Sequence, residues 1–546
     1  MQWVVRLFWL LPLGFYGATA SPTPGWVDAP LIARTVYLLD LSTWVNHHNL
    51  FTLVGHAWLR LTPGLDPHFA LNLLAALFGA LTVGVVFRIG LRLTRNVIAS
   101  AIGATLLMVS HSLWWHSTML EVYTLSTLLL TLCLLFVVRF NQEASFRNLC
   151  IAVFLFGLAC SNHIQMGLVG FGFPVLLLQA PVREALSGKR LVALLACFLL
   201  GFQVYLWVFV SQYLALVDAG TDATTALHWM LENTTGGGFR QYMFPQGLSI
   251  EERAFWWAFY FGLFIYNFPL PWLLLAPLGL WAWWKREELR TSFLFFTPVL
   301  VVQLLWSSNY LIWDMFAFSL PAYVLTGLLI LLGIDRMMRR GTRARRTIYA
   351  LAPTILLIPV LYGAVPSWVA DNKHAIRFFE KIPQYAQVTA FWDPLEYFLN
   401  PNKRGYDRVD RYAEAILTKL KPDACFWGNE ATMFYPLKYY YQDVLGERKD
   451  VSYHAIFGIL GDPADFARHV DTLYDQLRSD CPVYVSSLGY PEREVLNRLY
   501  YRLKRTRSRA EIEELPTASF AESFPRYRIE PVPIAGESAK FFRLAR

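Results

Sequence analysis

The chain has 546 residues, of which 55% are hydrophobic and only 16% are charged, with a mean hydropathy of +0.36. A soluble globular domain carries about 25% charged residues, so the composition excludes an ordinary soluble protein and predicts an integral membrane protein. The formal net charge is +8, but the basic residues lie in short loops and in the tail. That distribution suits orientation in a lipid bilayer and argues against a nucleic-acid partner.

Eleven apolar runs are long enough to cross ~30 Å of hydrocarbon. A signal peptide cleaved after Ala18-Thr19-Ala20 is an alternative for the first run, but its single preceding charge, Arg6, favours a retained span. The stretch 254–284 is compatible with one tilted span or two short ones. The expected spans lie near 3–20, 68–88, 97–115, 119–139, 147–163, 164–180, 191–215, 257–284, 291–307, 317–335 and 347–364.

The charges of the loops predict the orientation. With the N-terminus inside, seventeen Lys and Arg residues fall in cytoplasmic loops, and only Arg34, Arg60, Arg240 and Arg253 fall in outer ones. An excess of positive charge marks the cytoplasmic side. We therefore expect a multi-pass protein of the cell (inner) membrane, with its N-terminus in the cytoplasm. The outer segment 21–67 contains amphipathic stretches, near 31–41 and 50–61, that suit the membrane interface.

From about residue 365 the pattern changes to helix and strand in alternation. Helices are expected near 405–420, 431–445 and 463–478, and strands near 423–427, 450–456 and 482–487. Such alternation predicts a small α/β domain. The expected fold is therefore an all-α polytopic membrane domain over 1–364, followed by an extracytoplasmic α/β domain over 365–546. Cys425 and Cys481 could pair there, since disulfides form outside the cytoplasm.

Asp28 is an acid placed just outside the first apolar run, within Gly25–Pro30. A charge that persists near hydrocarbon usually marks a site, so Asp28 is a candidate general base. The alternative is a helix start, because Asp followed by Pro at the first turn is a common N-terminal signal. Composition alone leaves both interpretations open.

Glu121 opens a later apolar run and, in the predicted topology, lies at the same face as Asp28. It stands near His111, Trp115 and His116, so a polar site with an aromatic wall is one interpretation. A helix N-terminus with interfacial tryptophans is the other. His163, in the next outer turn, could donate to a phosphate or act as a polar cap.

Two further outer segments carry candidate ligand contacts. The loop 216–253 combines a Gly run with Arg240, which suits closure over an anionic head group, although a mobile connector has the same composition. His47 and His48 are adjacent and lack the i, i+4 spacing of a compact metal site, so His47 is a candidate substrate contact and no metal is expected. The sequence has no nucleotide-binding Gly loop, zinc spacing or serine-nucleophile motif.

Together these features resemble the GT-C superfamily of membrane glycosyltransferases, which take sugar from a polyprenyl-phosphate carrier. The chain is most similar to the branch long described as a domain of unknown function, which includes transmembrane O-mannosyltransferases. The resemblance rests on Ser112–Tyr123, on Gly157–His163 and on Asn72-Leu73-Leu74, with weaker similarity at Trp313-Asp314 and in the tail. The chain departs from the family where Pro30-Leu31 replaces a Gly-Glu pair and where His47–Leu50 replaces His-Pro-Pro-Gly.

The resemblance implies that Asp28 accepts a proton from the acceptor hydroxyl as that oxygen attacks the sugar. It implies that the lipid phosphate departs with its charge stabilised by His163, Arg240 or Arg34, and that Glu121 and Tyr123 order the site. Neither a cofactor nor a metal is required. The expected partners are a polyprenyl-phosphate sugar and an acceptor protein, lipid or glycan.

Two other functions remain as alternatives. A transporter or flippase of a lipid-linked glycan would also need outer polar residues, but it would be expected to carry polar residues at mid-membrane, where these spans are almost uniformly apolar. A non-enzymatic assembly subunit would use its tail to bind a partner.

Overall fold

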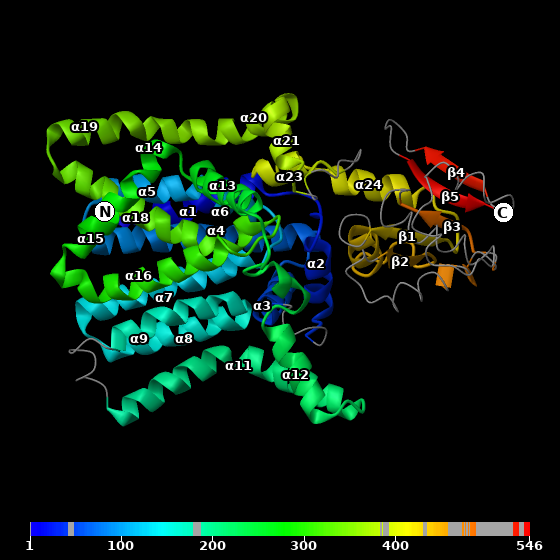
Figure 1. Cartoon of the computed structure of the whole chain (residues 1–546), viewed down its shortest axis with the longest axis horizontal. Coiled ribbons are helices and arrows are strands. Elements are labelled where there is room, and N and C mark those ends of the chain that lie inside the picture. Colours follow the sequence, from blue (N-terminus) through cyan, green and yellow to red (C-terminus); the bar gives the residue numbers. More distant parts are fainter. Residues whose placement is uncertain are drawn as a thin grey trace. The chain divides into compact units, whose positions relative to one another are not determined.

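The computed structural model describes residues 2–41, 48–177, 187–382, 385, 392–429, 434–456, 472–473, 475–476, 479, 481–486, 528–533 and 540–545. Its elements are shown in Figure 1. The chain forms two compact units: a helical unit (1–21, 39–386 and 394–405) and a mixed unit (22–38, 387–393 and 406–546).

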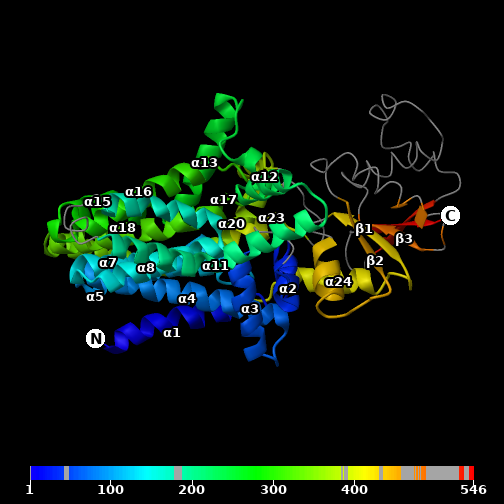
Figure 2. The ribbon, with the colours of Figure 1, turned by 90° about the horizontal axis from the view of Figure 1, so that it is seen from below.

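The helical unit contains the expected all-α membrane part. In Figures 1 and 2 its long helices α4, α7 and α8 run side by side, and each packs on the next. Its elements are α1 (Gln2–Thr19), α3 (Asn49–Leu61), α4 (Pro67–Thr94), α5 (Val97–Met108), α6 (His111–His116), α7 (Tyr123–Glu143), α8 (Phe146–Asn162), η1 (Ile164–Phe171), α9 (Gly172–Leu177), α11 (Gly188–Asp218), α12 (Ala223–Thr234), η2 (Gly237–Tyr242), α13 (Ile250–Asn267), α14 (Leu270–Leu273), α15 (Leu275–Trp284), η3 (Glu287–Leu289), α16 (Arg290–Ser307), α17 (Met315–Phe318), α18 (Leu320–Arg339), α19 (Thr342–Leu351), η4 (Ala352–Leu357), α20 (Ile358–Asp371), α21 (Lys373–Phe379) and α23 (Pro394–Leu399).

Six helices in the described part of the chain are long and apolar enough to cross a membrane. They are α4, α7, α11, α18, η3 with α16 (Glu287–Ser307), and the continuous stretch from α19 to α20 (Thr342–Asp371). The segments Ile250–Asn267 and Leu270–Trp284 meet at a bend of 91° and add a seventh if they count as one span. Three shorter apolar helices, Val97–Met108, Phe146–Asn162 and Ile164–Leu176, lie where further spans were expected. The number of eleven crossings stays a prediction.

Local sequence explains why these helices begin and pack where they do. The Asp66 side chain accepts a hydrogen bond from the Phe69 N–H at 2.9 Å, which caps α4. Close helix contact depends on glycine: a Cβ on Gly279 of α15 would lie 1.8 Å from the Leu329 carbonyl oxygen of α18. Small residues let apolar helices approach in this way without a driving force from water.

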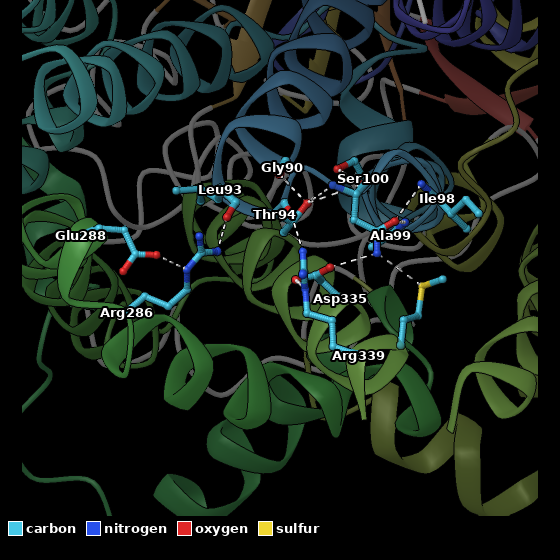
Figure 3. A network of polar contacts seen from close by, with 12 residues as sticks. Gly90, Leu93, Thr94, Ile98, Ala99, Ser100, Arg286, Glu288, Asp335 and Arg339 are labelled. Carbon is cyan, nitrogen blue, oxygen red and sulfur yellow. Dashed lines mark hydrogen bonds and ion pairs between the residues drawn. The ribbon is translucent and has the colours of Figure 1, made fainter. Parts of the chain in front are cut away.

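A network of arginines and acids closes one end of this helical unit (Figure 3). Asp335 near the end of α18 is buried and accepts hydrogen bonds from Asn96 Nδ2 at 2.9 Å and Arg339 Nε at 2.8 Å. Arg339 also donates to the carbonyl of Thr94, and Arg286 donates to the carbonyl of Leu93. These carbonyls end α4 and have no partner within the helix. We call these residues the arginine end.

The arginine end lies one helix length from the start of α7. Gln142 in the last turn of α7 donates to the Arg92 carbonyl in the last turn of α4 at 3.0 Å, so both helices finish there. The 21 residues of α7 span about 30 Å. Tyr123, which begins α7, therefore lies about one hydrocarbon thickness away from the arginine end.

The mixed unit contains a five-stranded sheet in the order β2-β1-β3-β5-β4. β1 pairs in parallel with β2 and β3, whereas β5 pairs antiparallel with β3 and β4. Its elements are α2 (Ala29–Leu38), α24 (Arg408–Leu417), β1 (Cys425–Asn429), η6 (Pro436–Gln442), β2 (Ser452–Ile456), β3 (Val483–Val485), β4 (Arg528–Pro533) and β5 (Lys540–Ala545).

The α/β prediction for the tail is confirmed, and two more strands join it. The three expected strands correspond to β1, β2 and β3, and the expected helix at 405–420 corresponds to α24. The π-helix η6 lies within the expected helix 431–445, whereas most of 463–478 lies outside the described residues. Cys425 and Cys481, whose pairing the sequence left open, form a disulfide with Cα atoms 6.2 Å apart.

The compact units divide the chain differently from the expected boundary at 364/365. Residues 22–38 of the first outer segment belong to the mixed unit, because Arg34 Nε makes a 2.9 Å ion pair with Asp443 and Trp26 Nε1 donates to the Tyr406 hydroxyl at 2.8 Å. A composition shift along the chain cannot reveal such a return. The expected amphipathic segments are confirmed as helices α2 and α3.

Candidate functional site

Asp28 follows a strained turn that is held firmly on both sides. Val27 has φ 60°, in the left-handed region, which a β-branched residue rarely adopts. Trp26 before it is buried and bonded to Tyr406, and Asp28 after it accepts a main-chain hydrogen bond from Ile32 at 2.9 Å, which starts α2. Strain of this kind costs about 1–3 kcal/mol and clusters at functional sites. The helix-start interpretation of Asp28 is therefore correct for its backbone, whereas the role of its side chain as a base stays a prediction.

The Asp28 carboxylate combines exposure with a low-dielectric surrounding. The residue keeps an exposed surface, yet protein atoms surround it densely enough that desolvation raises its pKa above the usual aspartate range. A raised pKa makes the carboxylate a stronger base. General-base catalysis is most effective when the pKa of the base approaches the working pH.

Four rings gather where α6, α7, α8 and the start of α3 meet. His116 lies 5.3 Å from Tyr123, Tyr123 lies 5.4 Å from His163, and His163 lies 4.9 Å from His48, measured between ring centroids. Phe318 packs edge-on against Tyr123 at 5.5 Å. We call His48, His116, Tyr123 and His163 the four-ring cluster. It joins the predicted residues Tyr123 and His163 to two that were not predicted.

Backbone contacts fix how two of these histidines present their nitrogens. The Gln165 N–H donates to His163 Nδ1 at 3.2 Å, which places the proton of a neutral His163 ring on Nε2. Burial and the neighbouring His48 lower the pKa of His163 well below its usual value, so the ring stays neutral. His163 therefore offers one N–H donor, as its predicted role toward a phosphate requires.

Asn162 ties this region together from within α8. Its Nδ2 donates to the Val122 carbonyl at 3.0 Å and to Ser126 Oγ at 2.8 Å, which holds the start of α7. The main-chain carbonyl oxygen of Asn162 lies 3.0 Å from His48 Nδ1. Asn162 is 1% exposed, so these contacts fix the rings rather than bind a ligand.

The other predicted acids and cations have different surroundings. Glu121 is half-buried two residues before α7, where an acid is favoured by the helix dipole. Arg240 is exposed on the short helix η2, as its role over a head group needs. Arg34, in contrast, makes an ion pair with Asp443 and lies over the Tyr439 ring, with 5.7 Å from Cζ to the centroid. Its charge is therefore neutralised within the mixed unit.

The predicted substrate role of Trp115 is wrong. The indole is 3% exposed, and its N–H donates to the Tyr397 carbonyl at 2.7 Å. Lys403 lies over the ring with 5.9 Å from Nζ to the centroid, and it donates to the carbonyls of Tyr397 and Asn400. Trp115 therefore stabilises the contact between α6 and α23. Almost none of its surface is exposed to a ligand.

His47 lies outside the described residues, so its predicted contact stays a prediction. Within the described ranges, no group of three or more His, Cys, Asp or Glu side chains is placed to hold a metal ion. The expectation that no metal is needed is left untested by this finding.

Sequence reasoning missed His48 and His116 as members of the cluster. His48 appeared only as a neighbour in a histidine pair, and His116 only as one of several polar residues near Glu121. The available signal was their position: each lies at an outer end of a predicted helix, as Tyr123 and His163 do. Their proximity depends on the packing of α3 and α6 beside α7 and α8, which no local pattern encodes.

Comparison with known proteins supports the resemblance to this enzyme class. Residues 47–184 match the family described as the Protein O-mannosyl-transferase TMEM260 N-terminal domain. A segment of 171 residues is 27% identical to Protein O-mannosyl-transferase TMEM260 of Mus musculus, covering 30% of this chain and 24% of the mouse protein. The chain thus matches about a quarter of that relative's length. The residues 47–184 that match the family contain all four members of the four-ring cluster.

Solved structures establish the fold. The structure of ArnT from Cupriavidus metallidurans bound to undecaprenyl phosphate superposes with a TM-score of 0.59 and 14% identity, covering 99% of this chain and 97% of that one. The same enzyme in its apo state gives a TM-score of 0.55. The described chain therefore shares the fold of ArnT, which confirms the polytopic helical fold expected from its sequence.

Proposed function

We propose that the protein is an integral membrane glycosyltransferase that moves a sugar from a polyprenyl-phosphate donor to an acceptor hydroxyl on the extracytoplasmic face. The observation that carries this proposal is Asp28: a carboxylate of raised pKa, held in place by a strained and anchored turn. The fold shared with ArnT, which binds undecaprenyl phosphate, supports the donor class. The relative named as an O-mannosyl-transferase supports transfer to oxygen.

The proposed reaction is a single displacement with inversion at the anomeric carbon. Asp28 takes the proton of the acceptor hydroxyl while that oxygen forms the new bond to the sugar. The bond between the anomeric carbon and the phosphate oxygen breaks, and the lipid phosphate leaves with the electron pair. The Nε2–H of His163 and the guanidinium of Arg240 stabilise the charge that develops there. Glu121 orders the site beside Tyr123.

A protein hydroxyl is the first acceptor to test, because the matched relative is named as a protein O-mannosyl-transferase. The sugar is less constrained, since Pro30-Leu31 replaces the Gly-Glu pair that follows the first aspartate in the similar family. Asp28 then lacks the neighbouring acid that the family carries. Donors other than mannose therefore belong in the same assay.

The proposed orientation places the arginine end in the cytoplasm and the four-ring cluster outside, in the cell (inner) membrane. It is supported by the excess of positive charge at the arginine end and by the ~30 Å length of α7 between the two. The Cys425–Cys481 disulfide supports an extracytoplasmic tail, because such bonds persist in oxidising compartments.

The experiment is sugar transfer by the purified protein in detergent, with a panel of polyprenyl-phosphate sugars and a hydroxyl-bearing peptide. Asp28→Asn keeps the shape of the side chain and removes the base. Asp40→Asn is the matched control on the same outer segment. We expect a loss of about 100- to 10,000-fold in kcat for Asp28→Asn, the range of general-base catalysis, and near wild-type rates for Asp40→Asn.

Equal activity in Asp28→Asn and wild type would keep the transferase and move the base to another residue, with Glu121 the next to test. If folded wild-type protein transfers none of the donor sugars to peptide, lipid or glycan acceptors, the transferase proposal fails. Transport of a lipid-linked glycan would then be the function to test.

A further inference from the structure

Five arginines lie where α18 passes into α19, next to the arginine end. Arg336 is in the last turn of α18, Arg340 is the C-cap residue of that helix, and Arg343 is in the first turn of α19. Arg345 and Arg346 follow directly in α19. We call these five residues the basic corner. All of them except the half-buried Arg336 are exposed, so the basic corner presents a concentrated positive charge at the surface of the helical unit.

Acids of the described chain do not balance the charge of the basic corner. Arg339, which lies between Arg336 and Arg340, pairs with Asp335 at 2.8 Å. Among the residues that the structure describes, no ion pair includes an arginine of the basic corner. The sequence from 336 to 370 contains no Asp or Glu. Like charges so close along the chain repel one another, so an anion from outside the chain is favoured here.

Arg336 has surroundings that point to a ligand. Its Cζ lies 5.1 Å from the ring centroid of Trp281, in the last turn of α15, and α15 packs along α18. The Nε atom of Arg336 is buried, and no group in the described residues accepts a hydrogen bond from it. A buried donor of a charged group that lacks a protein partner calls for a bound anion or another bound molecule. The planar guanidinium suits a phosphate, whose oxygens accept its hydrogen bonds in pairs.

The start of α19 increases the positive potential of the basic corner. Its N-cap residue Gly341 has φ 139°, a conformation that glycine adopts readily, and it makes no side-chain capping bond. The first turn of α19 contains no acid, although acids are the residues that the helix dipole favours there. Arg343 lies there instead. The first backbone N–H groups of α19 and the arginines beside them therefore attract the same kind of ligand, an anion.

The apolar surroundings indicate that this anion is a lipid head group. α18 and the stretch Thr342–Asp371 are both long and apolar enough to cross a membrane, and Arg340 and Gly341 join them. The basic corner therefore lies where two spans reach the same face of the membrane. Trp281 and Trp284 of α15 are each 43% exposed, and tryptophans at the end of a span favour the level of the lipid head groups. Clusters of basic residues directly beyond a span attract anionic lipids.

We propose that the basic corner binds the phosphate of an anionic phospholipid in the leaflet at the arginine end. Arg336 and Arg340, four residues apart and therefore on one helix face, donate to the phosphate oxygens. The Trp281 ring packs against the glycerol and the first acyl carbons. The other three arginines of the basic corner strengthen the attraction. The site is independent of the proposed sugar transfer, because it uses none of the residues proposed for that reaction.

Native mass spectrometry of the full-length protein, released from mixed micelles of phosphatidylglycerol and phosphatidylcholine, measures which lipid stays bound. We expect wild type to retain phosphatidylglycerol at least about tenfold better than phosphatidylcholine. Arg336→Gln/Arg340→Gln should lower this preference at least about fivefold. Arg147→Gln/Lys189→Gln is the matched control, because it removes the same charge from exposed positions at the starts of α8 and α11. It should change the preference less than about twofold, since diffuse surface charge contributes little.

Trp281→Leu tests for a built site while leaving every charge in place. The leucine keeps an apolar surface but removes the ring over which the Arg336 guanidinium lies, so the preference for phosphatidylglycerol should fall about threefold. The thermal midpoint of each variant in the same detergent should stay close to that of wild type. If the Arg336 variant does not fold, Arg343→Gln/Arg345→Gln, at exposed positions, should lower the preference about threefold instead.

Several outcomes would overturn the proposal. Equal retention of the two lipids by wild type would exclude a site for anionic lipid. A loss of preference in the Arg147→Gln/Lys189→Gln control as large as in Arg336→Gln/Arg340→Gln would show diffuse attraction to the whole face. An unchanged preference in Trp281→Leu would show the same. Displacement of phosphatidylglycerol by inorganic phosphate at millimolar concentration would assign the basic corner to a free anion rather than to a lipid head group.

Discussion

The two ends of the helical unit solve different problems with polar residues. At the arginine end, Arg286 and Arg339 each pair with an acid and also donate to a carbonyl that ends α4 (Figure 3). At the four-ring end, His116 Nε2 is buried without a hydrogen-bond partner, and His48 is strained. The arginine end holds helices together through these bonds, whereas the four-ring end contains a buried ring nitrogen that no protein group satisfies.

This difference distinguishes polar residues that stabilise the fold from polar residues that are candidates for catalysis. Buried charges that are paired and fully hydrogen-bonded mark structure, and they are costly to break. Buried polar atoms that lack a partner call for an explanation such as a catalytic role or a bound molecule. Substitutions at the two ends should therefore separate stability from activity.

Asn162→Leu should produce the largest combined effect, because the side-chain amide of Asn162 holds the start of α7, where Tyr123 of the four-ring cluster lies. We expect a loss of about 2–3 kcal/mol in unfolding free energy, since the Val122 carbonyl and Ser126 hydroxyl lose a buried partner. Transfer activity per folded molecule should fall at least tenfold. Ser126→Ala, which spares the Val122 bond, is the control and should lose less of both. Normal transfer activity in Asn162→Leu would contradict a functional role for the four-ring end.

Asp335→Ala should affect stability alone. Removing the buried carboxylate leaves Asn96 Nδ2 and Arg339 Nε without that acceptor, which costs about 2 kcal/mol because Arg339 is partly exposed and can turn to water. The thermal midpoint in detergent should fall while kcat/KM of the folded fraction stays unchanged. Glu143→Ala, in an exposed pair with Arg92, should lower the thermal midpoint much less, because solvent screens an exposed ion pair. A drop in kcat/KM for Asp335→Ala would show that the two ends are coupled.

Lowering the pH should destabilise the four-ring end before it destabilises the arginine end. Burial lowers the pKa of His116 to about 4, below its unfolded value near 6.5. The unfolded chain therefore binds more protons between these values, and stability falls as pH drops from 6.5 toward 4. For His116, lowering the pH from 7 to 5 should remove on the order of 1–2 kcal/mol. Thermal midpoints across this range should show the loss, and His116→Phe should reduce it; an unchanged slope in that variant would assign the effect elsewhere.

Arg240→Gln should have the smallest effect on the fold, because the side chain is exposed on η2. We expect unfolding free energy to change by less than about 0.5 kcal/mol. If Arg240 covers the donor head group as proposed, KM for the donor should rise several-fold with kcat nearly unchanged, because the contact is made before and during the reaction. Unchanged KM would leave the connector interpretation of the loop 216–253.

The parts of the structure predicted from sequence are those that follow local rules. The apolar runs predicted most of the helices, and the alternating helix and strand patterns of the tail predicted β1, β2 and β3. Cys425 and Cys481 were named as possible disulfide partners. Asp28 was singled out because a charge beside an apolar run can be recognised from the amino-acid sequence alone. Its strained neighbour Val27 was not, since a left-handed valine has no sequence signal.

Tertiary contacts account for the failures. Trp115 resembled an interfacial aromatic, but the buried Lys403 and the Tyr397 carbonyl enclose it from a segment almost 290 residues away. Arg34 resembled a free outer cation, but Asp443 returns to it. The orientations of the His48 and His163 rings depend on individual backbone bonds, which emerge only when four helices meet.

The discontinuity of the mixed unit has a consequence for biosynthesis. Residues 22–38 leave the ribosome early, whereas their partners from 406 onward follow after a separation of about 370 residues. At 5–20 residues per second, that interval lasts about 20–70 s. Throughout it, Trp26 lacks Tyr406 and Arg34 lacks Asp443, so the turn that presents Asp28 is without these anchors. The proposed base is therefore set in its final geometry only near the end of synthesis, and a nascent chain truncated before residue 406 should insert in the membrane without becoming active.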